Sequence, residues 1–241
     1  MDINCPNLVR IDQDAFSNSG VKNILNLGSI QRIDRAFLGC NIDTVIIPES
    51  VTEYINPFSN GSVTKLTINE ENLISLHGGL PLNAIGKDVM NLKNVTESDW
   101  GALFNGGCTQ VYLPKATSTS GITWFFTLDK NTPFYAQLVY FRDLSAIADG
   151  EAMFRMCTIQ HVVINNTTVI PVYDRTWFDG NSVNALYVPD EVVDSYKADD
   201  VWGAFGNKIK PISELPIVDT KADWDKLDQQ GKNKTLIREY M

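Results

Sequence analysis

Four cysteines and two histidines are the side chains of this 241-residue chain best suited to metal binding or nucleophilic chemistry. Cys157 and His161 lie four positions apart, but the sequence predicts a turn leading into a strand there, and no third ligand is nearby. No Cys-x-x-Cys pair occurs, which is the spacing typical of zinc sites and redox-active pairs. We therefore expect buried free thiols and no metal ion or other cofactor.

The other residues with catalytic potential are the second histidine, two glycine pairs and two acidic pairs. Neither Gly78-Gly79 nor Gly106-Gly107 opens a predicted helix with a lysine following, as a phosphate-binding loop would. The acidic pairs Glu70-Glu71 and Asp199-Asp200, like His77, are predicted to lie in solvated loops. The sequence therefore predicts no catalytic residue, and we expect a protein that is not an enzyme.

The sequence contains an internal repeat, and this repeat predicts the strands and turns that would position any functional side chain. Phe16 and Phe37 are 21 residues apart, as are Phe37 and Phe58, and a short apolar run follows each of them. With Leu80 and Phe125 taken as further members, about eight units of 21 to 29 residues cover most of the chain. A period in the low twenties is typical of a solenoid. The recurring phenylalanines are Phe16, Phe37, Phe58, Phe104, Phe154 and Phe178.

Each unit is predicted to hold one short strand. Val45 and Ile47 alternate with polar or outward positions, which is the period of a strand, and Pro48 ends that strand. Asn, Ser and Gly follow several of the phenylalanines and supply turns. The pattern favours parallel strands joined by turns and short helical or irregular segments. A β-sandwich of short strands is the alternative, although a sandwich has no reason to repeat a phenylalanine at a fixed phase.

Several phrases resemble the repeats of BspA-like leucine-rich repeat proteins. They are "IDQDAFSNSG", "IDRAFLGC", "VIIPESVTEYINPF" and "EAMFRMC". The segment "ALYVPDEVVDSYKADDVWGAFGNKIKPI" resembles the terminal unit of that family, with a strand, a short helix, a Trp-containing turn and a last strand. The resemblance implies an α/β solenoid of leucine-rich repeats over residues 1–184 and a C-terminal capping unit over 185–212. Residues 213–241 leave the repeat and are expected to form a charged tail.

The same resemblance implies a function. The family suggests a non-catalytic module that is extracellular or on the cell surface of anaerobic bacteria, where it binds a protein partner or a host surface ligand in adhesion. Related repeats occur in phage tail proteins, so the alternative is a structural or receptor-binding component of a virion. The chain opens with "MDINCPNLV", without the basic start and apolar stretch of a signal peptide.

The charge balance narrows the range of partners. The net charge is −9 and the pI is about 4.7, so nucleic acid is not an expected partner because its phosphates would be repelled. No apolar run approaches the roughly 18 residues that a membrane-spanning helix needs, so membrane insertion is not expected.

A stripe of residues in the middle of the predicted strands is the first candidate contact surface. These positions must point away from the core, yet most of them are apolar or aromatic. An exposed apolar stripe normally marks a contact site. The alternatives are that loops cover the stripe, or that the residues are there for strand propensity alone. The candidate residues are Leu25, Ile46, Thr67, Tyr112, Val163 and Tyr187.

An aromatic segment, "ITWFFTLDKNTPFYAQLVYF", coincides with the longest unit. It is predicted to fill an irregular part of the core where the repeat has degenerated. The alternative is that its rings grip a sugar or a protein, which would make the chain a carbohydrate-binding module. The rings considered are Trp124, Phe126, Phe134, Tyr135 and Tyr140.

The charged tail is the second candidate site. Its apolar residues are too few to form a core, but their spacing could place one narrow face against another subunit of a larger assembly. We therefore expect an attachment element that lies outside the fold. The residues are Trp224, Leu227, Leu236, Ile237 and Tyr240.

Overall fold

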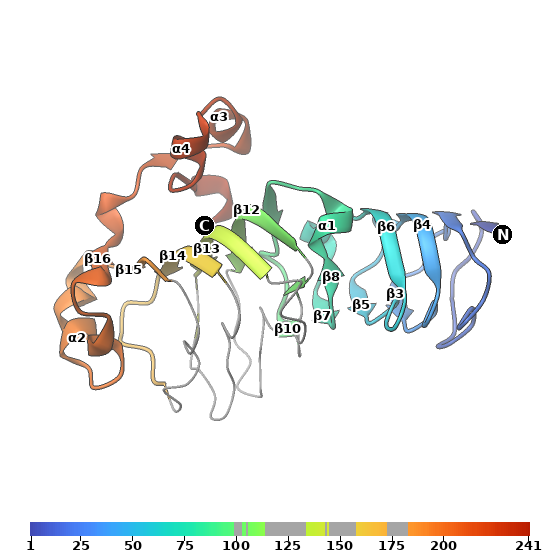
Figure 1. Ribbon diagram of the computed structural model, residues 1–241, viewed down its shortest axis with the longest axis horizontal. Coiled ribbons are helices and arrows are strands. Elements are labelled where there is room, and N and C mark those ends of the chain that lie inside the picture. The colour runs from blue at the N-terminus through green and yellow to red at the C-terminus, as the bar shows by residue number, and fades with distance from the viewer. Residues whose placement is uncertain (99–102, 105, 114–133, 143, 145–157, 173–182) are drawn as a thin grey trace.

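A computed structural model describes residues 1–98, 103–104, 106–113, 134–142, 144, 158–172 and 183–241. In these residues every pair of neighbouring strands runs parallel, and the helices are few and short. The molecule is elongated, with the first strands at one end and helix α2 (Val193–Ala198) near the other (Figure 1). The prediction of short parallel strands with short helical segments is therefore confirmed for the described residues.

The N-terminal part contains two four-stranded sheets that share one core. In the first sheet, Ile24 lies beside Val45 and Val45 beside Leu66, and all three are buried. The strands of this sheet, in spatial order, are β1 (Asp2–Asn4), β2 (Asn23–Asn26), β4 (Asn41–Ile46) and β6 (Ser62–Thr67).

In the second sheet, Ile33 lies beside Tyr54 and Tyr54 beside Leu76, and these side chains join the same hydrophobic cluster. The strands of the second sheet are β3 (Arg32–Asp34), β5 (Glu53–Ile55), β7 (Ser75–His77) and β10 (Glu97–Ser98). A two-stranded sheet of β8 (Leu80–Pro81) and β11 (Leu103–Phe104) follows, with η1 (Glu70–Asn72) and α1 (Leu82–Ile85) nearby in the chain.

Three of the recurring phenylalanines stack in one column. The ring centroids of Phe16 and Phe37 are 5.4 Å apart, and those of Phe37 and Phe58 are 5.8 Å apart. Phe37 is fully buried, and its two neighbours pack against the core. The predicted column is confirmed for these three residues, while the side chains of Phe104, Phe154 and Phe178 lie outside the described residues.

The C-terminal part is built on a six-stranded sheet. The aromatic segment ends in one of its strands. Tyr140 is buried, as predicted, but in a regular strand paired with the preceding one and not in an irregular core, whereas Tyr135 is 53% exposed. Trp124 and Phe126 lie outside the described residues. The strands are β9 (Val89–Asn91), β12 (Gly106–Leu113), β13 (Phe134–Phe141), β14 (Thr158–Ile164), β15 (Ala185–Val188) and β16 (Ile209–Pro211).

The described strands do not form one uninterrupted ladder, because β6 and β9 belong to different sheets. The order of elements predicted for residues 185–212 is confirmed: η3 (Asp190–Val192), α2, η4 (Trp202–Lys208) and β16 follow β15. Trp202 is buried, and its indole N–H donates a hydrogen bond to the carbonyl of Ile170 at 2.8 Å.

Residues 212–241, here called the closing segment, lie on one side of the six-stranded sheet (Figure 1). Thr220 and Asp228 cap its two helices, because their side-chain oxygens accept hydrogen bonds from the backbone N–H groups of Asp223 and Gly231. Its elements are η5 (Ile212–Glu214), β17 (Ile217–Val218), α3 (Lys221–Asp225), α4 (Gln229–Lys232), β18 (Leu236–Ile237) and η6 (Arg238–Tyr240).

The cysteines among the described residues are unpaired: Cys5 is exposed, and Cys40 and Cys108 are buried. Cys157 lies outside the described residues. No helix in the described part of the chain is long and apolar enough to span a membrane.

Candidate functional site

The outer face of the six-stranded sheet carries half of the predicted contact stripe. Val111, Val139 and Val162 are neighbours in register and point into the main core. The residues next to them along each strand must point to the other face, because side chains alternate. They form one row across the sheet, which is Asn91, Tyr112, Tyr140, Val163, Tyr187 and Lys210.

Tyr112, Val163 and Tyr187 are therefore brought together, as a stripe that points away from the main core. The expectation that they are exposed is wrong. Tyr112 and Val163 are 0% exposed and Tyr187 is 7% exposed. The physical reason is that the closing segment covers this face, so these three side chains belong to a second hydrophobic core that includes Leu215 and Trp224.

Buried hydrogen bonds fix the closing segment on the sheet. The side-chain amide of Gln110 donates to the carbonyls of Lys232 at 2.7 Å and Thr235 at 2.9 Å. The hydroxyl of Tyr112 donates to the side-chain carbonyl of Gln110 and accepts from the backbone N–H of Ile237, each at 2.8 Å. Burial raises the pKa of Tyr112 well above its usual value, so this hydroxyl keeps its proton.

Trp224 is the largest side chain that the closing segment inserts. It is 0% exposed, and the ammonium groups of Lys221 and Lys232 lie 4.7 and 4.9 Å from its ring centroids. Such cation–π contacts let the lysine chains cover the ring while their charges reach solvent. The indole therefore packs within its own chain.

The expectation that the tail is an attachment element is wrong for its central residues. Trp224, Leu236 and Ile237 are all 0% exposed inside the chain, and Leu227 and Tyr240 are partly buried in the same second core. The sequence showed both partners of this contact, the apolar stripe on the strands and the apolar residues of the tail. It gave no signal that the tail covers the stripe, because the contacts join residues more than 100 positions apart.

The first three residues of the predicted stripe remain exposed. Leu25 is 42% exposed and Ile46 is 41% exposed, and they are neighbours on adjacent strands because Ile24 pairs with Val45. Thr67 follows on β6 beside Ile46 and is also exposed. The outer face of the first sheet is therefore an open surface with two adjacent aliphatic side chains.

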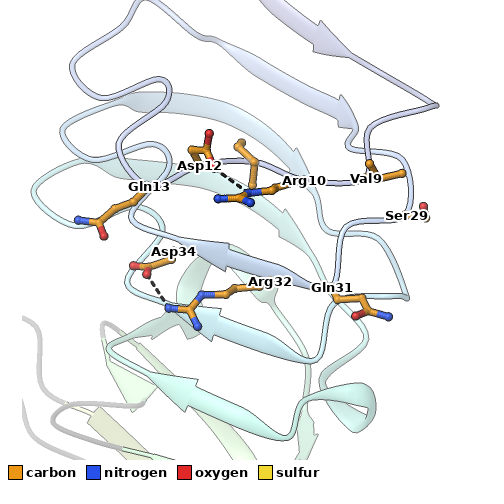
Figure 2. Close-up of a pocket in the computed structure, with 9 residues that line it drawn as sticks. Val9, Arg10, Asp12, Gln13, Ser29, Gln31, Arg32 and Asp34 are labelled. Carbon is orange, nitrogen blue, oxygen red and sulfur yellow. Dashed lines mark hydrogen bonds and ion pairs between the residues drawn. The ribbon is translucent and has the colours of Figure 1, made fainter.

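A polar site lies on the edge of the second sheet. Arg10 pairs with Asp12 and Arg32 pairs with Asp34, each at 2.8 Å, and the four side chains line a depression of about 670 Å³ (Figure 2). Arg32 also reaches Glu53 on the next strand at 3.0 Å.

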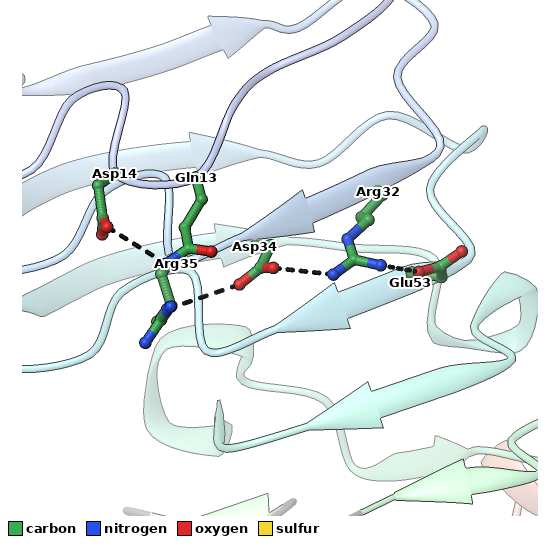
Figure 3. A network of polar contacts seen from close by, with 6 residues as sticks. All are labelled: Gln13, Asp14, Arg32, Asp34, Arg35 and Glu53. Atoms are coloured by element: carbon green, nitrogen blue, oxygen red, sulfur yellow. Dashed lines mark hydrogen bonds and ion pairs between the residues drawn. The ribbon is translucent and has the colours of Figure 1, made fainter.

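The paired charges continue as a chain of ion pairs along this face. Asp34 contacts Arg35 at 3.7 Å in addition to Arg32, and the amide of Gln13 donates to Asp14 at 3.3 Å (Figure 3). Arg32, Arg35 and Glu53 are substantially exposed, so these pairs are screened by water and contribute little to stability. They do fix the order of charges that the face presents to solvent.

His161 lies on β14 at the outer face of the six-stranded sheet. Its ring meets Tyr187 edge-on at 5.7 Å, and its Nδ1 atom is buried without a hydrogen-bond partner. Burial lowers the pKa of His161, and the positive charges of Lys210 and Lys234 lower it further. Within the described residues, no group of three or more His, Cys, Asp or Glu side chains is arranged to hold a metal ion.

Comparison with known proteins found no match to this chain among protein-family models or among curated proteins.

Proposed function

We propose that this chain is a non-catalytic protein-binding module, built as a leucine-rich repeat α/β solenoid of the BspA-like type and displayed outside the cell. The observation that carries the proposal is the exposed pair Leu25 and Ile46 on the outer face of a rigid parallel sheet. The equivalent face of the six-stranded sheet is closed by the chain itself. An apolar surface that the chain leaves open is the natural place for a partner.

The regular offset between neighbouring strands supports the solenoid. Asn23 donates to Asp2 and Ser62 donates to Asn41, each at 2.8 Å, and each pair is 21 residues apart. Side chains that repeat their contacts at one fixed offset are the signature of stacked units. The stacked phenylalanines, 5.4 and 5.8 Å apart, follow the same offset.

The composition of the open face supports binding to protein. Leu25 and Ile46 are bordered by Thr67 and by the exposed charged side chains of Asp43 and Lys65. Apolar side chains at the centre with polar groups at the rim are the usual anatomy of a protein interface. Because the sheet backbone is fixed by its ladder, little ordering cost opposes association.

A binding screen with matched variants tests this function. The protein is applied to an array of extracellular and cell-surface proteins and to a glycan array. The double substitution Leu25→Ser and Ile46→Ser is compared with Ile74→Ser, which changes an isoleucine that is 48% exposed elsewhere. We expect protein binders that are lost in the double variant and kept in Ile74→Ser. Binding to glycans alone, or binders that neither variant affects, would overturn the proposal.

A further inference from the structure

The second sheet has an open edge at β3. In the spatial order of that sheet β3 comes last, and within the described residues no backbone hydrogen bond joins residues 9–13 to it. Backbone hydrogen bonds do form on either side of this unpaired stretch. The N–H of Ser29 donates to the carbonyl of Leu8 at 2.9 Å, and the N–H of Phe16 donates to the carbonyl of Ala36 at 2.8 Å. Residues 9–13 therefore lie beside β3 without completing the ladder.

The backbone of β3 shows which groups face the gap. The carbonyl of Gln31 accepts a hydrogen bond from the N–H of Thr52, just before β5, and the N–H of Arg35 donates to the carbonyl of Ile55 in β5, each at 2.9 Å. In a parallel ladder alternate residues bond to opposite sides. The backbone N–H and carbonyl groups of Arg32 and Asp34 consequently point toward residues 9–13, where no strand pairs with them.

The order of charges differs between the two sides of β3. Arg10 and Asp12 lie over Arg32 and Asp34 in the same order, arginine above arginine and aspartate above aspartate (Figure 2). Like charges directly opposite each other destabilise strand pairing. On the closed side, Arg32 stands opposite Glu53 in the register and bonds to it at 3.0 Å.

The gap has the size and polarity of a binding site. Its volume is about 670 Å³, which is in the range of ligand-binding pockets. Gln13 and Gln31 line it in addition to the two Arg–Asp pairs. An occupant with a negative group between the two arginines and a positive group between the two aspartates would turn both like-charge contacts into attractive ones.

We propose that this depression binds a short extended peptide segment of a partner protein, parallel to β3, with an acidic residue followed two positions later by a basic one. The backbone of the peptide forms hydrogen bonds with the free N–H and carbonyl groups of Arg32 and Asp34. Its acidic side chain contacts the two arginines of the depression, and its basic side chain contacts the two aspartates. This mode is addition of a strand to a sheet edge. The site is separate from the face of Leu25 and Ile46, so the two proposals stand or fall independently.

Titration of the intact protein with capped seven-residue peptides tests the proposal. The probe alternates Val and Thr around a central Glu-Val-Lys, and the controls carry Glu-Val-Glu and Lys-Val-Lys. Binding of the probe with a Kd of about 1 mM or below is expected, at least about tenfold tighter than either control, with amide NMR shifts centred on Arg32 and Asp34. Equal binding of all three peptides, no binding of the probe, or shifts elsewhere would overturn it.

A charge-swapped variant sharpens the test. The double substitution Arg10→Glu and Asp12→Lys places opposite charges over Arg32 and Asp34, so residues 9–13 become matched to β3 and compete with the peptide. Both positions are highly exposed, at 83% and 73% of the side chain, so folding is preserved. Binding of the probe should fall at least about tenfold. The matched control exchanges another exposed pair, Arg238→Glu with Asp219→Lys, and should bind as the unmodified chain does.

Two results of the variant experiment would contradict the proposal. One is that the swap at positions 10 and 12 leaves peptide binding unchanged. The other is that the free edge pairs with a second copy of the chain, seen as a concentration-dependent dimer in sedimentation that the swap abolishes, without binding of the probe.

Discussion

The backbone N–H of Ile237 donates a hydrogen bond to the hydroxyl of Tyr112 at 2.8 Å, across 125 residues of sequence. The same hydroxyl donates to Gln110, whose amide holds two carbonyls of the closing segment. A buried hydroxyl with both a donor and an acceptor partner fixes a single arrangement of the two layers. The end of the chain is therefore part of the fold and closes one half of its outer surface.

Removing this hydroxyl should loosen the closing segment. Tyr112→Phe keeps the ring but leaves the N–H of Ile237 and the carbonyl of Gln110 without a partner. The free energy of unfolding should fall by about 1–3 kcal/mol, with faster hydrogen exchange at Ile237. The matched control is Tyr135→Phe at a tyrosine that is 53% exposed, where urea denaturation should show no change. If both variants denature alike, the hydrogen bond does not hold the segment.

Truncating the column of phenylalanines should destabilise the N-terminal part. Phe37 is fully buried between two stacked rings, so Phe37→Ala removes a large side chain from a packed core. The expected loss is about 3–5 kcal/mol in chemical denaturation. Leu25→Ala, at a leucine that is 42% exposed, serves as the control and should change stability by about 0.5 kcal/mol or less. Similar losses in the two variants would mean that Phe37 is not core.

The phenylalanine column shows how far the sequence was informative. Phe16, Phe37 and Phe58 recur at one interval, and side chains at one interval in stacked strands must meet, so the sequence was sufficient there. The alternation of strand residues also placed Tyr112 and Val163 on the outer face correctly. Periodicity is a local property, however, and it cannot report what covers a face.

The sequence did not predict contacts between residues that are remote in the chain. Leu236 and Ile237 were expected to contact another subunit, but they form a two-residue strand that is buried against the residues of β12, more than 100 positions earlier. The gap beside β3 escaped for a different reason. Arg-Ile-Asp occurs at positions 10–12 and again at 32–34, but only the second forms a strand, and a local pattern does not show which backbone edge stays unpaired.

Acid should weaken the contact between the sheet and the closing segment. The pKa of His161 is lowered in the folded chain by burial, Lys210 and Lys234, so the unfolded chain binds the proton more readily. Stability from this residue is therefore fully present at neutral pH and decreases as the pH falls through the unfolded value of about 6.5.

The measurement is the free energy of unfolding between pH 5 and 8. His161→Gln should flatten the decrease toward acid. An unaltered pH profile in His161→Gln would show that this imidazole does not titrate with folding.

Deleting residues 217–241 should expose the second core. Trp224, Leu236 and Ile237 are fully buried, and each such side chain contributes about 1.5–3 kcal/mol by its removal from water. The truncated chain should melt at a lower temperature, bind a hydrophobic dye such as ANS and aggregate through Tyr112 and its neighbours. Unchanged melting without dye binding would mean that the segment is an appendage and not a layer of the fold.

Hydroxyl-radical footprinting of the unmodified protein, read by mass spectrometry, tests most directly the claim that the outer face is closed at one end and open at the other. Tyrosine and tryptophan react fastest when exposed, so burial decides which of them are oxidised. Tyr135, at 53% exposure, should be labelled, as should Leu25 and Ile46, while Tyr112 and Trp224 stay unmodified until the chain is denatured. Oxidation of Trp224 and Tyr112 in the native protein at the rate of Tyr135 would contradict the account.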